Sequence, residues 1–215
     1  MIVTGRVEGW RDGRLTASAP FPAPEILQRQ DIRFCEIRLI DGRSISPDQR
    51  RKIYATLRDI SDWTGYTPEE TKAILKYDYI ASEGVPYFSL SDVDMTTANG
   101  FLSHLIDFCI RHGVPTYDTP LLDRAPDVYR YLYSCLANKR CCITGRSAEL
   151  HHVDAVGAGR DREEIIHLGM RVLPLTREMH TKAHQIGRES FCTQYHVFGI
   201  ELDADLCKIW GVKDE

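Results

Sequence analysis

The chain has 215 residues, of which 43% are hydrophobic and 27% charged, and its formal net charge is −4. It is long enough for one large or two small domains with buried cores, and its 15 Gly and 10 Pro, which follow no period, exclude collagen-like and low-complexity proteins. No segment reaches the roughly 20 apolar residues of a membrane span, and the net negative charge excludes an overall basic surface for nucleic acid.

The N-terminal residues and the cysteines favour a reducing compartment. Charged residues are scattered through the first 15 positions, where a secretory signal peptide would have its apolar core. The seven cysteines are odd in number and irregularly spaced, unlike a disulfide framework. We therefore expect a cytoplasmic protein with no membrane segment, whose cysteines are reduced and mostly buried.

The first 40 residues are predicted to contain strands. Residues 2–8 and 13–18 have strand character, and Asp12-Gly13 between them is a turn signal. Residues 34–40 alternate between apolar and polar side chains, which predicts a third strand.

Helices are predicted from residue 47 to residue 137. Pro47 follows a capping Ser46, and Thr67 with Glu70 forms a capping box before a second helix. Apolar spacing and the Gly and Pro stops place these helices over residues 47–60, 71–79, 92–112 and 125–137.

The last 75 residues contain six of the eight histidines. Residues 141–146 are expected to be a strand running into a turn, and residues 149–153 a short strand that carries His151 and His152. A polar loop follows over residues 157–162, then an extended piece at 171–174 and a helix over 176–187. The order is that of a compact ββα unit.

Four histidines of this unit have the spacing of a metal site. His180 and His184 are four residues apart on the predicted helix, so their imidazoles can share one divalent cation. His151 and His152 are neighbours on a strand and point to opposite faces, so only one of them can readily join that cation. Solvent-exposed histidines on a surface helix and loop are the alternative for each pair taken alone.

The pattern of two adjacent histidines, a Gly-rich loop, Pro174-Leu175 and then HxxxH resembles the phage-encoded HNH, or ββα-metal, nucleases over about residues 135–190. The resemblance implies that His151, His180 and His184 bind a divalent metal and that His152 is the general base. It also implies phosphodiester hydrolysis, in which His152 takes a proton from water and the cation neutralises charge on the phosphate.

The sequence departs from this family pattern at two points. The middle Asn of many HNH motifs would fall near Arg171 in this sequence. Arg171 and His167 are candidates for contact with phosphate, and a structural salt bridge is the alternative. Thr176 and Met179 stand where many relatives have a second cysteine pair, so we expect no structural zinc. Arg160 and Arg162, in the loop between the histidine segments, are candidates for contact with the DNA backbone or are solvated loop charges.

Residues 41–60 resemble the opening helix of the phage NinB/Orf recombination-mediator family, and the order of elements over about residues 33–115 agrees. That resemblance implies a dimer that binds single-stranded DNA. A phosphate-binding patch would then consist of Arg43, Arg50, Arg51 and Lys52. The alternative is a solvated helix start beside Asp48. Four aromatic residues are expected to pack in the core rather than to stack on bases: Trp10, Trp63, Tyr66 and Tyr79.

Together the patterns predict an α+β protein with an Orf/NinB-like DNA-binding domain over residues 1–130 and an HNH domain over residues 131–215. The expected function is metal-dependent cleavage of single-stranded or branched DNA in phage recombination. The expected metal is Mg²⁺ or Mn²⁺ for activity, with Zn²⁺ or Ni²⁺ as other occupants. The expected partners are DNA, a second copy of the chain, and recombination or single-strand-binding proteins. The alternatives are a non-catalytic single-strand-binding mediator and a zinc-binding adaptor that contacts only protein.

Overall fold

The structure is a computed structural model, and it describes residues 5–20, 25, 29, 37, 39, 42–153 and 166–214. The chain forms two compact units, Met1–Leu39 and Ile40–Glu215. None of the helices in the described ranges has the length and apolar character needed to cross a membrane. Helices and two small antiparallel sheets are both present, which confirms the mixed α and β content.

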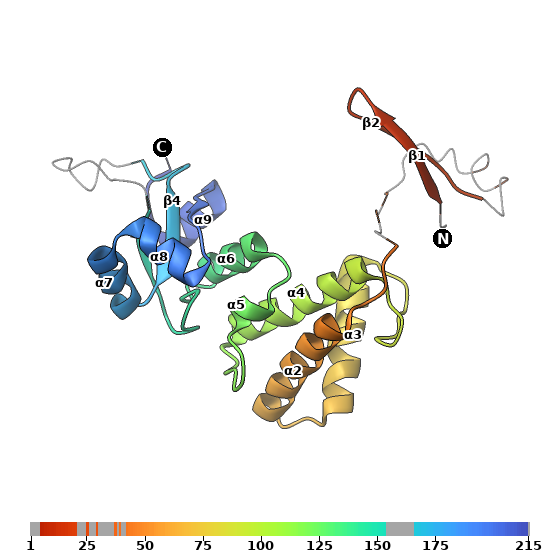
Figure 1. The fold of residues 1–215 in the computed structure, drawn as a ribbon, viewed down its shortest axis with the longest axis horizontal. Coiled ribbons are helices and arrows are strands. Elements are labelled where there is room, and N and C mark those ends of the chain that lie inside the picture. Colours follow the sequence, from red (N-terminus) through yellow and green to blue (C-terminus); the bar gives the residue numbers. More distant parts are fainter. Residues whose placement is uncertain are drawn as a thin grey trace. The chain divides into compact units, whose positions relative to one another are not determined.

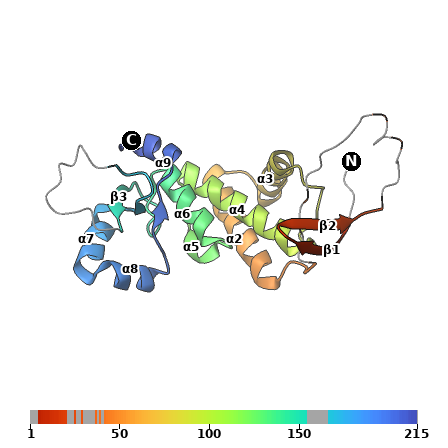
Figure 2. The same cartoon turned by 90° about the horizontal axis from the view of Figure 1, so that it is seen from above.

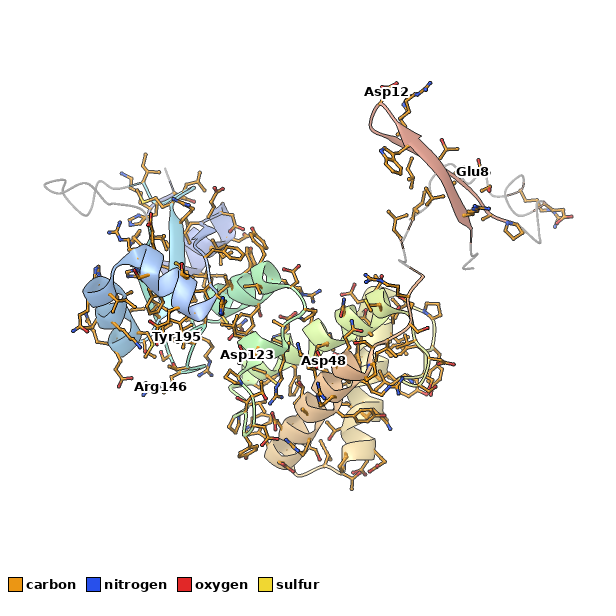
Figure 3. The ribbon with its side chains drawn as sticks, in the orientation of Figure 1. Glu8, Asp12, Asp48, Asp123, Arg146 and Tyr195 are labelled. Carbon is orange, nitrogen blue, oxygen red and sulfur yellow. The ribbon has the colours of Figure 1, made fainter. Side chains whose placement is uncertain are left out.

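The first unit contains a β-hairpin of β1 (Arg6–Arg11) and β2 (Arg14–Ser18). Its turn is the predicted one, with Asp12 and Gly13 both at positive φ (51° and 74°), as two-residue hairpin turns require. Asp12 lies at the tip of the hairpin (Figure 3). Trp10 is 82% exposed, so its expected place in a core is wrong. The strand predicted at 34–40 lies outside the described residues except Ile37 and Leu39, which belong to no strand.

Three long helices open the second unit, and each begins at a side-chain cap. Ser46 and Thr67 make the predicted capping interactions, and Asp94 accepts a hydrogen bond from the backbone N–H of Thr97. Gly65 and Gly113 end two of the helices in the left-handed conformation. The helices are α2 (Pro47–Thr64), α3 (Pro68–Glu83) and α4 (Met95–His112).

The helix predicted over residues 125–137 begins three residues later in the structure, and a short helix that was not predicted precedes it. The short α5 (Leu121–Arg124) stops at Ala125, whose backbone is extended because Pro126 follows it. The next helix, α6 (Val128–Ala137), begins after Asp127, which accepts a hydrogen bond from the N–H of Arg130. The preference of residues before proline for extended backbone thus excludes Ala125 from the predicted helix.

The C-terminal part has the predicted ββα order. Strand β3 (Glu149–His152) pairs with β4 (Arg171–Leu175), and α7 (Arg177–Ile186) follows directly. Residues 141–146 form a turn and not the expected strand, because Cys141 accepts a hydrogen bond from the N–H of Gly145. Three further elements complete the part, α8 (Arg188–Tyr195), β5 (Ile200–Glu201) and α9 (Ala204–Trp210).

Helix α4 links the two ends of the second unit. It contacts α2 and α3 on one side and α6 on the other, and α6 in turn contacts β4, β5 and α9 (Figures 1 and 2). The buried apolar side chains of all these elements form one contiguous core. The boundary predicted at residue 130 lies inside α6 and stays a prediction.

Of the aromatic residues expected in the core of the second unit, one is buried and two are exposed. Tyr79 is buried as expected, whereas Trp63 and Tyr66 are exposed, so the expectation for these two is wrong. The cysteines of the described part are free thiols, buried except for the half-buried Cys192, and Cys35 lies outside the described residues.

Candidate metal centre

The β3–β4 hairpin and α7 bring three histidines together. His151 lies opposite Leu173 in the β3–β4 ladder, and β4 leads directly into Thr176, whose side chain caps α7. His180 and His184 follow on α7 four residues apart, so both lie on the face of that helix that meets β3. The cap at Thr176 fixes the first residue of α7 and therefore the positions of the two imidazoles relative to β3.

The three imidazoles face one another closely. Their ring centroids are 4.5 Å apart for His151 and His180, 5.1 Å for His151 and His184, and 4.9 Å for His180 and His184. One nitrogen from each ring lies within 4.8 Å of the other two. Imidazoles on one cation place their ligating nitrogens about 3.4 Å apart, so side-chain adjustments of about 1 Å would complete a metal site.

The buried His151 fits the role of a metal ligand. It is 2% exposed, and its Nδ1 is buried and has no hydrogen-bond partner among the residues that the structure describes. Burial, together with the nearby His180 and His184, lowers the pKa of His151 to about 4. The ring is therefore neutral at physiological pH, as a metal ligand must be.

Glu149 supports the site from the same strand. Its Oε1 lies 2.5 Å from Nδ1 of His180, and its Oε2 lies 3.3 Å from Nε of Arg177. A carboxylate that accepts from Nδ1 of a histidine leaves Nε2 free for a metal, which is the usual arrangement around ligating histidines. The sequence analysis missed this residue, although its position two before His151 places both on one face of the strand.

His152 lies outside the triad, as its neighbouring place on the strand requires. It is half-buried on the face of β3 opposite His151, and its ring centroid is 5.2 Å from that of His167. The N–H of His167 donates to the carbonyl of Lys213, which ties this histidine to the C-terminal segment. The structure therefore pairs two of the predicted site residues that the sequence could not place together.

Of the three arginines of this region that were predicted to contact phosphate or DNA, one lies in the described part of the chain. Arg171 begins β4 beside the triad-bearing strand, and its carbonyl accepts from the N–H of Val153. Arg188, which was not predicted, donates to the carbonyl of Val153 at 3.0 Å and adds positive charge near His151. Arg160 and Arg162 lie outside the described residues.

The four basic residues predicted to form an N-terminal patch differ in their contacts, and the patch stays a prediction. Arg51 pairs with Asp48 at the start of α2, labelled in Figure 3, and Lys52 lies 3.5 Å from the same carboxylate. The hydrogen bond from Arg51 lowers the pKa of Asp48. Arg50 instead donates to the carbonyl of Ser91 at 2.7 Å, and Arg43 lies before α2 with its carbonyl bonded to the N–H of Met95.

The comparisons with known proteins address the family. No curated protein and no solved structure matches the chain. The family model described as "Putative HNHc nuclease" matches residues 21–213, nearly the whole chain. A nuclease of this type acts on nucleic acid and depends on a metal, and the histidine triad can hold one. The chain belongs to this HNH nuclease family.

Proposed function

We propose that the chain is a DNA endonuclease in which His151, His180 and His184 hold a divalent cation and His152 is the general base. The observation that carries the proposal is the convergence of three imidazoles from β3 and α7 within 4.8 Å. Family membership supports nuclease chemistry, and the triad supports its dependence on a metal.

The cation, when bound, supplies positive charge for the scissile phosphate and the leaving 3′ oxygen. The protein's residues perform the other tasks. His151, His180 and His184 are neutral donors and leave the full charge of the ion available to the phosphate. Glu149 orients His180 through the bond to Nδ1.

His152 is placed to move the proton. It takes a proton from the attacking water, which breaks the phosphodiester bond by in-line displacement. Because β3 is an edge strand of its sheet, a phosphate lying along it can meet groups from both faces, His152 on one and the triad on the other. The neighbouring His167 restricts the ring of His152.

The test is a plasmid-nicking assay with the full chain across Mg²⁺, Mn²⁺, Zn²⁺ and Ni²⁺. Three imidazoles favour Zn²⁺ and Ni²⁺ by affinity, whereas hydrolysis with Mg²⁺ or Mn²⁺ is the expected turnover condition. Nicking that requires a cation and disappears in His151→Ala supports the proposal. Cation-independent nicking, or full activity of His152→Ala, contradicts it.

We also propose that the substrate is single-stranded or branched DNA in phage recombination. The supporting observation is the resemblance of residues 41–60 to the NinB/Orf opening helix; residues 47–60 of this segment lie in α2. Cleavage of a fork or flap substrate at a higher rate than of duplex DNA is the expected result. Sedimentation of the chain tests the dimer, and pull-down with a single-strand-binding protein tests that partner.

A non-catalytic strand-binding mediator is the second candidate function. Arg171 near the position of the usual middle Asn favours it, because an Asn that orients the base is then missing. Oligonucleotide binding without cleavage under any cation would select this function over the nuclease.

A further inference from the structure

A polar cavity lies among the N-terminal helices of the second unit. Its residues are distant in sequence from β3 and α7, which carry the three histidines. It has a volume of about 380 Å³ and is formed by α2, α3 and the segment between α3 and α4. Its lining includes three cationic and two tyrosine side chains and no carboxylate. The residues that matter are Arg50, Tyr54, Lys72, Lys76, Tyr87 and Ser91.

The cations of this cavity are not neutralised by acidic neighbours. Lys76 is only 8% exposed, and its ammonium lies 3.8 Å from the ring centroid of Tyr87 and 4.9 Å from that of Phe88. In the described part of the chain, neither Lys72 nor Lys76 forms an ion pair. A nearly buried ammonium held by aromatic faces retains hydrogen-bond donors for an anion.

Arg50 adds a second unused donor. One terminal nitrogen of its guanidinium donates to the carbonyl of Ser91, whereas its Nε is buried and has no hydrogen-bond partner in the described ranges. Arg50 also lines the cavity, and no carboxylate pairs with it in the described ranges, so its positive charge favours an anionic ligand there.

Aromatic faces extend from the cavity to the surface. Tyr87 is 70% exposed, and its ring lies 6.2 Å from that of the exposed Tyr77. Tyr54 lies on another wall, with the ammonium of Lys72 5.8 Å from its ring centroid. Cations beside exposed aromatic rings are the combination by which proteins bind phosphates and unstacked bases of single strands.

We propose that this cavity is a strand-binding site, in which Arg50, Lys72 and Lys76 bind a backbone phosphate of single-stranded DNA and Tyr87 stacks on an adjacent base. The proposal deepens the proposed function by naming where the strand is held, and it rests on DNA being the substrate. It selects Arg50 from the predicted basic patch, because Arg51 and Lys52 are paired with Asp48.

The experiment measures fluorescence anisotropy of a labelled ten-nucleotide oligo(dT) with the full chain in EDTA, which prevents cleavage. Two variants test the two contacts, Lys72→Gln and Tyr87→Ala. Matched controls are Lys208→Gln on α9 and Tyr117→Ala, which change exposed residues of the same types elsewhere. Urea unfolding of each variant establishes that it is folded.

We expect Lys72→Gln to weaken binding about fivefold at low salt and to reduce the slope of log affinity against log salt by about 0.7, the value for one lost contact to a single strand. Tyr87→Ala should weaken binding about fivefold or more through lost stacking. The controls should bind as the unchanged protein does.

Unchanged binding by both cavity variants overturns the proposal. Equal competition by inorganic phosphate and by unlabelled oligo(dT), at the same phosphate concentration, also overturns it, because the cavity would then bind a free anion only. These outcomes are separate from the nicking assay. Loss of nicking in His151→Ala with no effect of Lys72→Gln on oligonucleotide binding leaves the nuclease standing without this cavity.

Discussion

Nδ1 of His180 lies 2.5 Å from Oε1 of Glu149, across the contact between α7 and β3. A carboxylate that accepts from Nδ1 fixes which nitrogen of this imidazole carries the proton and leaves Nε2 available as a metal ligand. Arg177 holds the second oxygen of the same carboxylate at 3.3 Å. The orientation of one proposed metal ligand thus depends on a residue to which no ligand role is assigned.

Replacing Glu149 tests this relationship. We expect Glu149→Gln to weaken the binding of Zn²⁺ or Mn²⁺ by about 10–100-fold, because His180 loses an ionic acceptor. Isothermal titration calorimetry with each metal gives the measurement. Glu178→Gln on α7 is the matched control, since Glu178 pairs with the exposed Arg146 instead. Arg146 is labelled in Figure 3. Equal affinity in the two variants would show that Glu149 does not position His180.

Replacing His151 removes a ligand rather than its support. His151→Ala should lower metal affinity more than Glu149→Gln does, because one of three donors is lost. Calorimetry and the nicking assay check both consequences. Retention of full metal affinity in His151→Ala would show that the ion is held elsewhere.

Replacing His152 should separate proton transfer from metal binding. We expect His152→Ala to slow nicking by about 10²–10⁴-fold while metal affinity stays unchanged, since this ring lies outside the triad. His196→Asn is the control, because His196 caps α8 at φ 53° and asparagine tolerates this conformation. A parallel loss of metal affinity in His152→Ala would assign this histidine to the ion instead.

The buried ion pair of Arg124 and Asp59 is expected to dominate the stability of the helical part. Their atoms are 2.7 Å apart, and both side chains are almost fully buried. Asp59→Ala should lower the free energy of unfolding by about 3–5 kcal/mol, because it leaves an uncompensated buried guanidinium. Urea denaturation measures this.

An exposed pair of the same types provides the control. Arg58 pairs with Asp118 at the surface. We expect Asp118→Ala to change the free energy of unfolding by about 0–1 kcal/mol. Similar losses in Asp59→Ala and Asp118→Ala would contradict the importance given to burial.

The buried thiols predict sensitivity to alkali. Burial raises the pKa of Cys109 and of Cys135 to about 12 from an ordinary value of 9.0. The unfolded chain therefore ionises these thiols before the folded chain does, so the free energy of unfolding falls as the pH rises from about 9 to about 12. Each thiol contributes about 1.4 kcal/mol per pH unit in this range.

Urea unfolding under reducing conditions at pH 8 to 11 checks the effect. Cys109→Ala should have a shallower decline than the unchanged protein, although it is less stable at pH 8. Equal slopes in the two proteins would show that Cys109 does not contribute.

Local sequence predicted the elements whose signals are themselves local. The caps at Ser46 and Thr67 act on residues three positions away, so these capping residues of α2 and α3 could be predicted to the residue. The convergence of His151 with His180 and His184 was also within reach, because helical spacing and the ββα order determine it. The roles assigned to these histidines stay predictions.

Other features depend on contacts between distant segments and could not be predicted. The approach of His167 to His152 is a tertiary contact, and His167 is also bonded to the distant Lys213, so no local pattern encodes its place. The cavity around Lys76 combines α2, α3 and a loop, none of which has a binding signal alone. The turn at residues 141–146 was misassigned because its apolar residues are buried by packing and not by strand pairing.

Helix α6 has a consequence for work on the C-terminal part by itself. Tyr131 donates to the carbonyl of Cys142, and Trp210 donates to the carbonyl of Leu136, while the opposite side of α6 packs on α4. A fragment beginning at residue 131 would lose the cap at Asp127 and uncover apolar surface. A fragment of the C-terminal part that is meant to fold by itself therefore has to include α4.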